Sequence, residues 1–159
     1  MLPLKTIVCS TDFSAASYEG VRAANELAEH FSAELILVHV IPSIPTTIVA
    51  GPAPPATPAA FNISSYQAEL EASSKKSLQE VVDRLVSGKV SVHPIIAHGN
   101  AADEIVRISE EKGADLIAIA THGQTGWRHL IFGSIAEKVV RFARCAVLTV
   151  QAPPQTDDD

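Results

Sequence analysis

A glycine-containing segment between a buried strand pattern and a helix pattern holds the residue types best suited to bind an anion. The segment runs from Ala120 to Ser134 and reads ATHGQTGWRHLIFGS. Glycine lets backbone N–H groups approach an anion closely, and a helix N-terminus presents unpaired donors at a positive dipole end. Gly123, Gly133 and Ser134 therefore indicate a phosphate site, and Ser134 is equally a candidate N-cap for the following helix.

Other motifs for nucleotide, metal or catalytic chemistry are absent from the sequence. There is no P-loop, and Gly123 with Gly126 does not complete the dinucleotide-binding fingerprint. The six histidines and two cysteines lack zinc-ligand spacing, and no G-x-S-x-G nucleophile elbow occurs. Arg128 is the single fixed cation of the segment, so any phosphoryl transfer there should be slow, because that chemistry needs electrostatic stabilisation.

Alternating strand and helix patterns must position this segment. Strands are predicted from short apolar runs at 4–9, 34–40, 90–97, 115–120 and 146–150. Helices are predicted between them at 14–31, 65–86, 101–112 and 134–143. Near-continuous Ile, Val and Leu content indicates strands buried on both faces, and hence a parallel sheet built from βαβ units.

The two edges of the sheet can be predicted from the third and fifth runs. Pro94 interrupts the third run, and because proline removes a ladder donor, that strand is expected at an edge. The fifth run, 146–150, has no proline, no charge and no following helix. It would be an unprotected edge, so we expect a homodimer through strand 146–150.

Two segments fall outside the alternation. Residues 42–64 hold most of the prolines and no charged residue, which predicts a long connection that is either a plain linker or a flap over a ligand. Residues 153–159 end in three aspartates and are expected to form a disordered acidic tail. The remaining residues, 1–152, are predicted to form one domain.

Composition excludes several classes of partner. The net charge is −6 and no run of Lys or Arg occurs, which argues against nucleic acid. The apolar runs have only strand length, so no membrane span is expected. The N-terminus lacks the features of a signal peptide, and Cys9 and Cys145 are predicted to be buried reduced thiols. We therefore expect a cytoplasmic protein.

The Ala120–Ser134 segment is similar to the ATP-binding signature of universal stress proteins, G-x2-G-x9-G-[ST]. Gly123, nine residues and then Gly133-Ser134 match this pattern, and the resemblance extends to 10–14, 37–40, 99–105, 113–117 and 136–140. It covers roughly residues 4–150. One position departs from the signature, because Ala120 stands where its first glycine is expected. Alanine adds one methyl group and still allows an extended backbone.

The resemblance implies a fold and a set of ligand contacts. The fold would be α/β, a single doubly wound parallel sheet of five strands in the order 3-2-1-4-5, with helices on both faces. Asp12 would bind the nucleotide near its ribose with Thr11 beside it, and the backbone of Val40 would face the adenine. The phosphates would be lined by Thr121, His122, Gly123, Gly133, Ser134 and Ile135, and Ala120 would also belong to the nucleotide site.

Plainer interpretations of some of these residues remain open. Asp12 and Ser14 compete as N-cap of the first helix, and His39 and His122 could serve ordinary packing. Gln124, Arg128 and His129 are polar candidates near a terminal phosphate. Mg²⁺ could accompany ATP, but its ligands cannot be identified from the sequence.

Three functions are consistent with these patterns. The leading hypothesis is an ATP-binding regulatory module that acts as a homodimer in the stress response. The alternatives are a nucleotide-free dimeric scaffold of the same family, which the departure at Ala120 favours, and a very slow ATP hydrolase.

Overall fold

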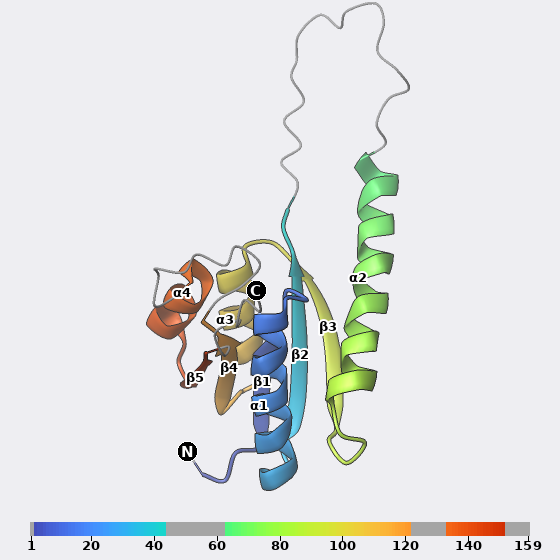
Figure 1. The fold of residues 1–159 in the computed structure, drawn as a ribbon. Helices are drawn as coiled ribbons and strands as arrows, with labels where there is room; N and C mark the ends of the chain where they lie inside the picture. The colour runs from blue at the N-terminus through green and yellow to red at the C-terminus, as the bar shows by residue number, and fades with distance from the viewer. Residues whose placement is uncertain (1, 44–62, 122–132, 152–159) are drawn as a thin grey trace, which may run out of the picture.

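The structure is a computed structural model that describes residues 2–43, 63–121 and 133–151 (Figure 1). Strands and helices alternate along these residues. The elements are β1 (Thr6–Ser10), α1 (Ala15–Phe31), β2 (Glu34–Ile41), α2 (Ile63–Leu85), β3 (Val92–His98), α3 (Ala101–Glu111), β4 (Leu116–Ala120), α4 (Ser134–Phe142) and β5 (Ala146–Val150). Their bounds lie within two residues of the predicted ones, the usual uncertainty at element ends.

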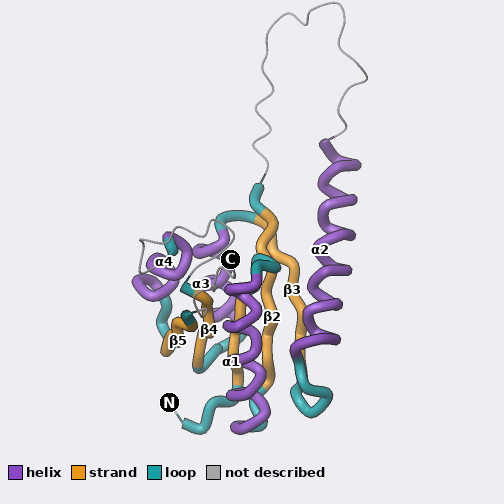
Figure 2. The backbone as a smooth tube through the Cα atoms, viewed as in Figure 1, coloured by secondary structure: helices purple, strands orange, loops and turns teal. Residues whose placement is uncertain are grey.

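The five strands form one parallel sheet in the order β3-β2-β1-β4-β5, which confirms the predicted topology. Helices α1 and α2 cover one face of the sheet, and α3 and α4 cover the other (Figures 1 and 2). Pro94 lies in the edge strand β3, opposite Leu37 of β2, as its missing N–H predicts.

Two apolar cores hold the helices to the sheet. Successive strand side chains point to opposite faces, so Leu35 and Leu37 of β2 join one core and Ile36 and Val38 join the other. The first core includes α1 and α2, and the second includes α3 and α4. Burial on both faces explains the continuous apolar runs of the sequence and makes the sheet a rigid base for its loops.

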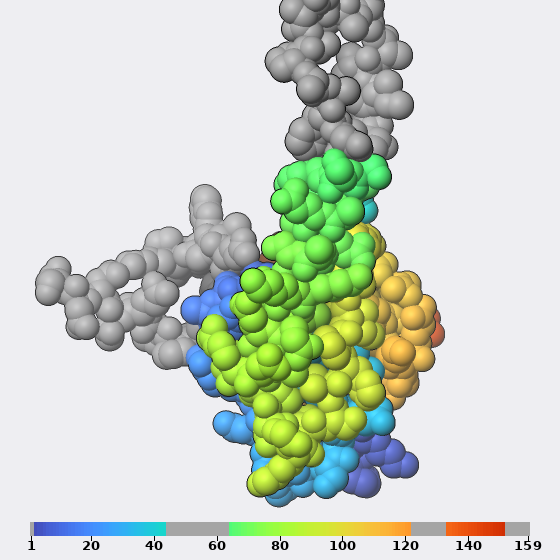
Figure 3. Space-filling model, turned by 90° about the vertical axis from the view of Figure 1, so that its right-hand side faces the viewer, coloured from blue at the N-terminus to red at the C-terminus, as the bar shows by residue number. Residues whose placement is uncertain are grey.

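The space-filling view shows α2 lying over the body of the domain and projecting beyond it at its N-terminal end (Figure 3). The predicted long connection lies almost wholly at 44–62, and the predicted acidic tail at 153–159. Both fall outside the described residues. Within the described ranges, every helix is too short or too polar to cross a bilayer.

The two cysteines differ in their surroundings. Both are free thiols, as predicted, but only Cys9 is fully buried, whereas Cys145 is partly exposed. Burial raises the pKa of the Cys9 thiol to about 12, so it stays protonated and unreactive at neutral pH.

Asp115 ties the start of β4 to the start of β1. Its carboxylate accepts the backbone N–H of Lys5 at 2.7 Å and of Thr6 at 3.1 Å, and these two bonds lower the pKa of Asp115. A lowered pKa stabilises the fold above the pKa of the unfolded chain, about 3.9, and the contribution is lost as the pH falls through the folded value.

We therefore expect Asp115→Asn to reduce the free energy of unfolding at pH 7 by about 1 kcal/mol, a low value because solvent reaches the carboxylate. The difference from wild type should shrink as the pH is lowered below about 4, measured by urea unfolding. Asp83→Asn on the exposed face of α2 is the control. A difference that stays constant between pH 7 and pH 3 would contradict this role of Asp115.

Candidate functional site

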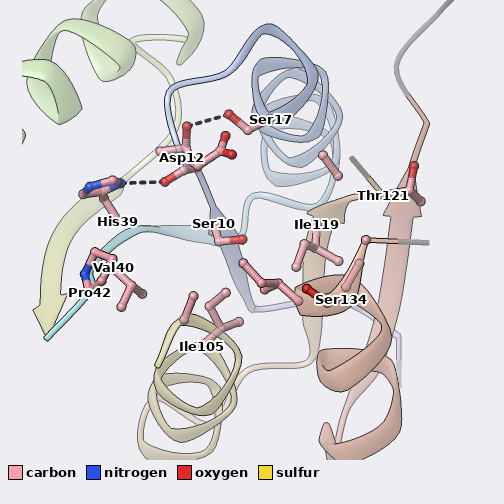
Figure 4. Close-up of a pocket in the computed structure, with 16 residues that line it drawn as sticks. Ser10, Asp12, Ser17, His39, Val40, Pro42, Ile105, Ile119, Thr121 and Ser134 are labelled. Atoms are coloured by element: carbon pink, nitrogen blue, oxygen red, sulfur yellow. Dashed lines mark hydrogen bonds between the residues drawn. The ribbon is translucent and has the colours of Figure 1, made fainter. Parts of the chain in front are cut away.

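A cavity of about 360 Å³ opens at the carboxyl ends of β1, β2 and β4, beside the N-termini of α3 and α4 (Figure 4). The strand order reverses here, because β1 has β2 on one side and β4 on the other. Such switch points leave a crevice where doubly wound sheets bind ligands. The lining residues are Ser10, Thr11, Asp12, Ser17, His39, Val40, Pro42, Ala101, Ile105, Ile119, Ala120, Thr121, Gly133, Ser134, Ile135 and Ala136.

Eight of the ten residues predicted to bind a nucleotide line this one cavity. They are Thr11, Asp12, Val40, Ala120, Thr121, Gly133, Ser134 and Ile135. The other two, His122 and Gly123, lie outside the described residues, as do Gln124, Arg128 and His129. Residues more than 100 positions apart in the sequence, such as Thr11 and Ser134, thus line the same cavity.

The N-terminus of α4 opens into the cavity without a side-chain cap. Its N-cap is Gly133, in extended conformation, so the prediction of Ser134 as N-cap is wrong and Ser134 is instead the first helical residue. Gly133 donates its N–H to the carbonyl of Thr121 at 2.6 Å. A Cβ on Gly133 would lie 2.8 Å from that carbonyl oxygen, closer than real Cβ contacts, so this approach requires glycine.

The two other helices that begin near the cavity are capped by side chains. Ser14 caps α1 by accepting the N–H of Ser17, and Asn100 caps α3 by accepting the N–H groups of Ala102 and Asp103. The N-cap of α4 is a glycine, which has no side chain to serve as such a cap, and the first residues of this helix line the cavity. The positive dipole end of α4 therefore lies at the cavity. This is the arrangement that binds anions.

Asp12 supports the cap of α1 and is not itself the cap. Its Oδ1 accepts the N–H of Ser14 at 3.0 Å and the Ser14 hydroxyl at 2.5 Å. The competition between Asp12 and Ser14 is thereby resolved in favour of Ser14. Asp12 also lines the cavity, where a carboxylate can accept hydrogen bonds from ligand hydroxyl or amino groups.

A directed chain of hydrogen bonds stabilises the turn between β1 and α1. The Ser17 hydroxyl donates to the carbonyl of Ser14 at 2.8 Å, so in the 2.9 Å contact between Thr11 and Ser17 the donor is Thr11. Thr11 in turn accepts the N–H of Phe13 at 3.1 Å. Both hydroxyl protons are used inside the protein, so Thr11 and Ser17 shape the wall of the cavity rather than donating to a ligand.

Half of the lining residues were not predicted as binding residues. They are Ser10, Ser17, His39, Pro42, Ala101, Ile105, Ile119 and Ala136. His39 offered a signal, because it is the one polar residue in the apolar stretch 35–41. The apolar lining residues offered no sequence signal, because helices and strands of the core carry the same residue types.

The described part of the cavity lining contains no Lys or Arg, and Asp12 is its one acidic residue. Within the same described ranges, no group of three or more His, Cys, Asp or Glu side chains is placed to hold a metal ion. An anionic ligand group would therefore rely there on backbone N–H donors and on the α4 dipole.

A doubly wound parallel sheet with a cavity at its switch point places the chain in the class of open α/β folds. The family model described as the Universal stress protein family matches residues 3–151. Universal stress protein MJ0531 of Methanocaldococcus jannaschii is 32% identical over 149 residues, which cover 94% of this chain and 83% of that protein. The chain therefore belongs to the universal stress protein family.

Solved structures share the fold. The protein MJ0577 of M. jannaschii aligns with a TM-score of 0.73 at 24% identity, covering 96% of this chain and 99% of that one. A universal stress protein in complex with cAMP aligns at 0.63 and 20%, covering 93% and 97%. One from Archaeoglobus fulgidus in complex with dAMP aligns at 0.60 and 20%, covering 94% and 98%. The last two of these proteins thus bind adenine mononucleotides.

Proposed function

We propose that this chain binds an adenine nucleotide, ATP among them, in the cavity between β1, β4 and α4. We propose further that it acts as a homodimeric regulatory module of the stress response in the cytosol, where the free thiols Cys9 and Cys145 would stay reduced. Nucleotide occupancy would then change the shape or the partners of the dimer.

The observation that carries the proposal is the N-terminus of α4 at the cavity, where the N-cap residue Gly133 has no side chain to cap the helix. Gly133 brings the start of this helix against Thr121, and the residues that follow it, whose N–H groups have no partner inside the helix, line the cavity. A phosphate would satisfy these donors and interact favourably with the helix dipole. The mononucleotides bound by the related cAMP and dAMP complexes carry such a phosphate.

The rest of the cavity suits a nucleoside. Its volume of about 360 Å³ lies within the range of small-molecule sites, roughly 300–1,000 Å³. Ile105, Ile119 and Pro42 give it apolar walls that a base can pack against, while Asp12 offers a carboxylate acceptor to a ribose hydroxyl. Mg²⁺ would reach the site with ATP, held by the phosphates rather than by an acidic cluster of the described residues.

The proposal is tested by identifying what the protein carries. Protein purified without added nucleotide is denatured, and the released small molecules are identified by mass spectrometry. Calorimetry with ATP, AMP and cAMP then measures affinity on nucleotide-free protein. Release or micromolar binding of an adenine nucleotide is expected. If none is released and none binds, the nucleotide-free scaffold is the better function. Multiple-turnover ATP hydrolysis would instead favour the hydrolase.

The alanine at the first signature position should have little effect on binding. A Cβ built on Gly20 of α1 would lie 3.9 Å from the Ala120 Cβ. Side chains alternate along β4, with Ala118 in the core that includes α1 and Ile119 in the core that includes α3. The methyl group of Ala120 therefore points toward α1, beside the space that Gly20 leaves open.

We accordingly expect Ala120→Gly to change the nucleotide dissociation constant by less than about threefold, under 1 kcal/mol. The comparison is calorimetry on wild type and variant under identical conditions. A tenfold gain of affinity in the variant would mean that the methyl group obstructs the ligand and would contradict this placement.

A further inference from the structure

The turn that carries Asp12 to the cavity contains a residue in an unfavourable conformation. Phe13 has φ of 65°, in the left-handed region that bulky residues rarely adopt. No glycine occurs between β1 and α1, so the chain holds this conformation with contacts instead. Residues kept in such regions are over-determined by their surroundings and often occur at ligand sites.

The contacts that hold the turn come from the end of β2. The His39 ring stacks on the Phe13 ring, with centroids 4.2 Å apart and planes 28° apart. His39 Nδ1 lies 2.8 Å from the carbonyl oxygen of Thr11 (Figure 4). Since a carbonyl can only accept, Nδ1 carries the proton of this bond. One imidazole thus contacts the residues on both sides of Asp12.

We propose that His39 is a positioning residue of the nucleotide site, and that His39 and Phe13 form a clasp that fixes the direction of the Asp12 carboxylate. Thr11 is held through its carbonyl by His39 and through its N–H by the carbonyl of Val38, at 2.9 Å. Phe13 is held by the ring stack. Asp12, between them, reaches the cavity from a turn that has little freedom left to lose on binding.

The clasp also sets the distance between two walls of the cavity. His39 precedes Val40, which also lines the cavity. The hydrogen bond from His39 to Thr11 therefore connects β2, which contributes Val40 to the cavity, with the turn that contributes Asp12. A role in plain packing would need only an apolar ring or chain at position 39, whereas the clasp needs a planar donor.

This inference rests on the proposed function, and two variants of His39 test it. His39→Asn keeps an N–H donor at the position of Nδ1 and a planar group for Phe13. His39→Leu fills similar space without a donor. Calorimetry measures the affinity for ATP and for AMP, thermal unfolding reports stability, and hydrogen exchange reports the N–H groups of Phe13 and Ser14 without any ligand.

We expect His39→Leu to lose at least tenfold in affinity and to speed exchange at Phe13 and Ser14, and His39→Asn to stay within about threefold of wild type in both. Equal affinities for wild type and His39→Leu would overturn the proposal. So would equal losses in both variants, since the imidazole itself would then be what the ligand needs.

If wild type binds neither ATP nor AMP, the proposed function fails. The clasp is then tested by hydrogen exchange at Phe13 and Ser14 alone. Faster exchange in His39→Leu but not in His39→Asn supports it, and unchanged exchange in both overturns it.

Discussion

Replacing Gly133 by valine is expected to abolish nucleotide binding while the domain stays folded. A Cβ at this position would lie 2.8 Å from the carbonyl oxygen of Thr121, and the neighbour is backbone, which cannot rotate away. The start of α4 must move, so the 2.6 Å bond between Gly133 and Thr121 is lost and the helix donors turn from the cavity. Losing hydrogen bonds to a charged phosphate should cost about 3 kcal/mol or more, roughly a hundredfold in dissociation constant.

Gly88→Val is the matched control, because a Cβ on Gly88 would meet nothing within 4 Å. Calorimetry with ATP and AMP, together with circular dichroism and thermal unfolding, is run on both variants. Only Gly133→Val should lose binding, and both should melt cooperatively. Unchanged affinity in a folded Gly133→Val protein would mean that the phosphate does not bind at α4. Gly133→Ala, with a single added methyl group, should show an intermediate loss.

The strands and one edge of the sheet could be predicted from local residue patterns, whereas the strand order came from the resemblance to universal stress proteins. Pro94 cannot donate to a central ladder, so the edge position of β3 is visible in the sequence. Several predicted element ends differ from the observed ones by one or two residues, as at β3, which begins at Val92. Such ends depend on individual backbone hydrogen bonds that residue types do not specify.

The site could be predicted only in part. Glycine and serine at the start of α4 signal an anion site, yet which of them is the N-cap depends on how closely Gly133 approaches Thr121. The left-handed conformation of Phe13 carries no sequence signal, because the expected residue there would be glycine or asparagine. The partner of His39 lies 28 residues away, and only the parallel register of β1 and β2 brings the two together.

The second large effect is expected at the β5 edge of the sheet. We predict that the proposed homodimer dissociates into monomers when Leu148→Lys and Val150→Lys are combined. In the described chain β5 pairs with β4 alone, and its other edge is unpaired. Leu148 is 36% exposed, and α4, which contacts β5, exposes Val140 and Phe142 by 48% and 57%. An apolar edge strand flanked by exposed apolar side chains is a surface that a second chain would cover.

Antiparallel pairing of β5 with the same strand of a second copy would satisfy the edge N–H and C=O groups and create a two-fold contact. A two-fold axis through the middle of Ala146–Val150 brings Leu148 opposite its own copy, so lysines there would face each other directly. The apolar burial of Leu148 and Val150 would also be lost in both copies. The dimer should therefore weaken by at least about 4 kcal/mol, roughly a thousandfold in dissociation constant.

The control variant is Ser91→Lys with His93→Lys, which adds the same charge at the β3 edge and should leave the dimer intact. The test is sedimentation at micromolar concentration. A monomeric wild type would refute the dimer. A β5 variant that remains dimeric, or dissociation of the β3 control, would place the interface elsewhere.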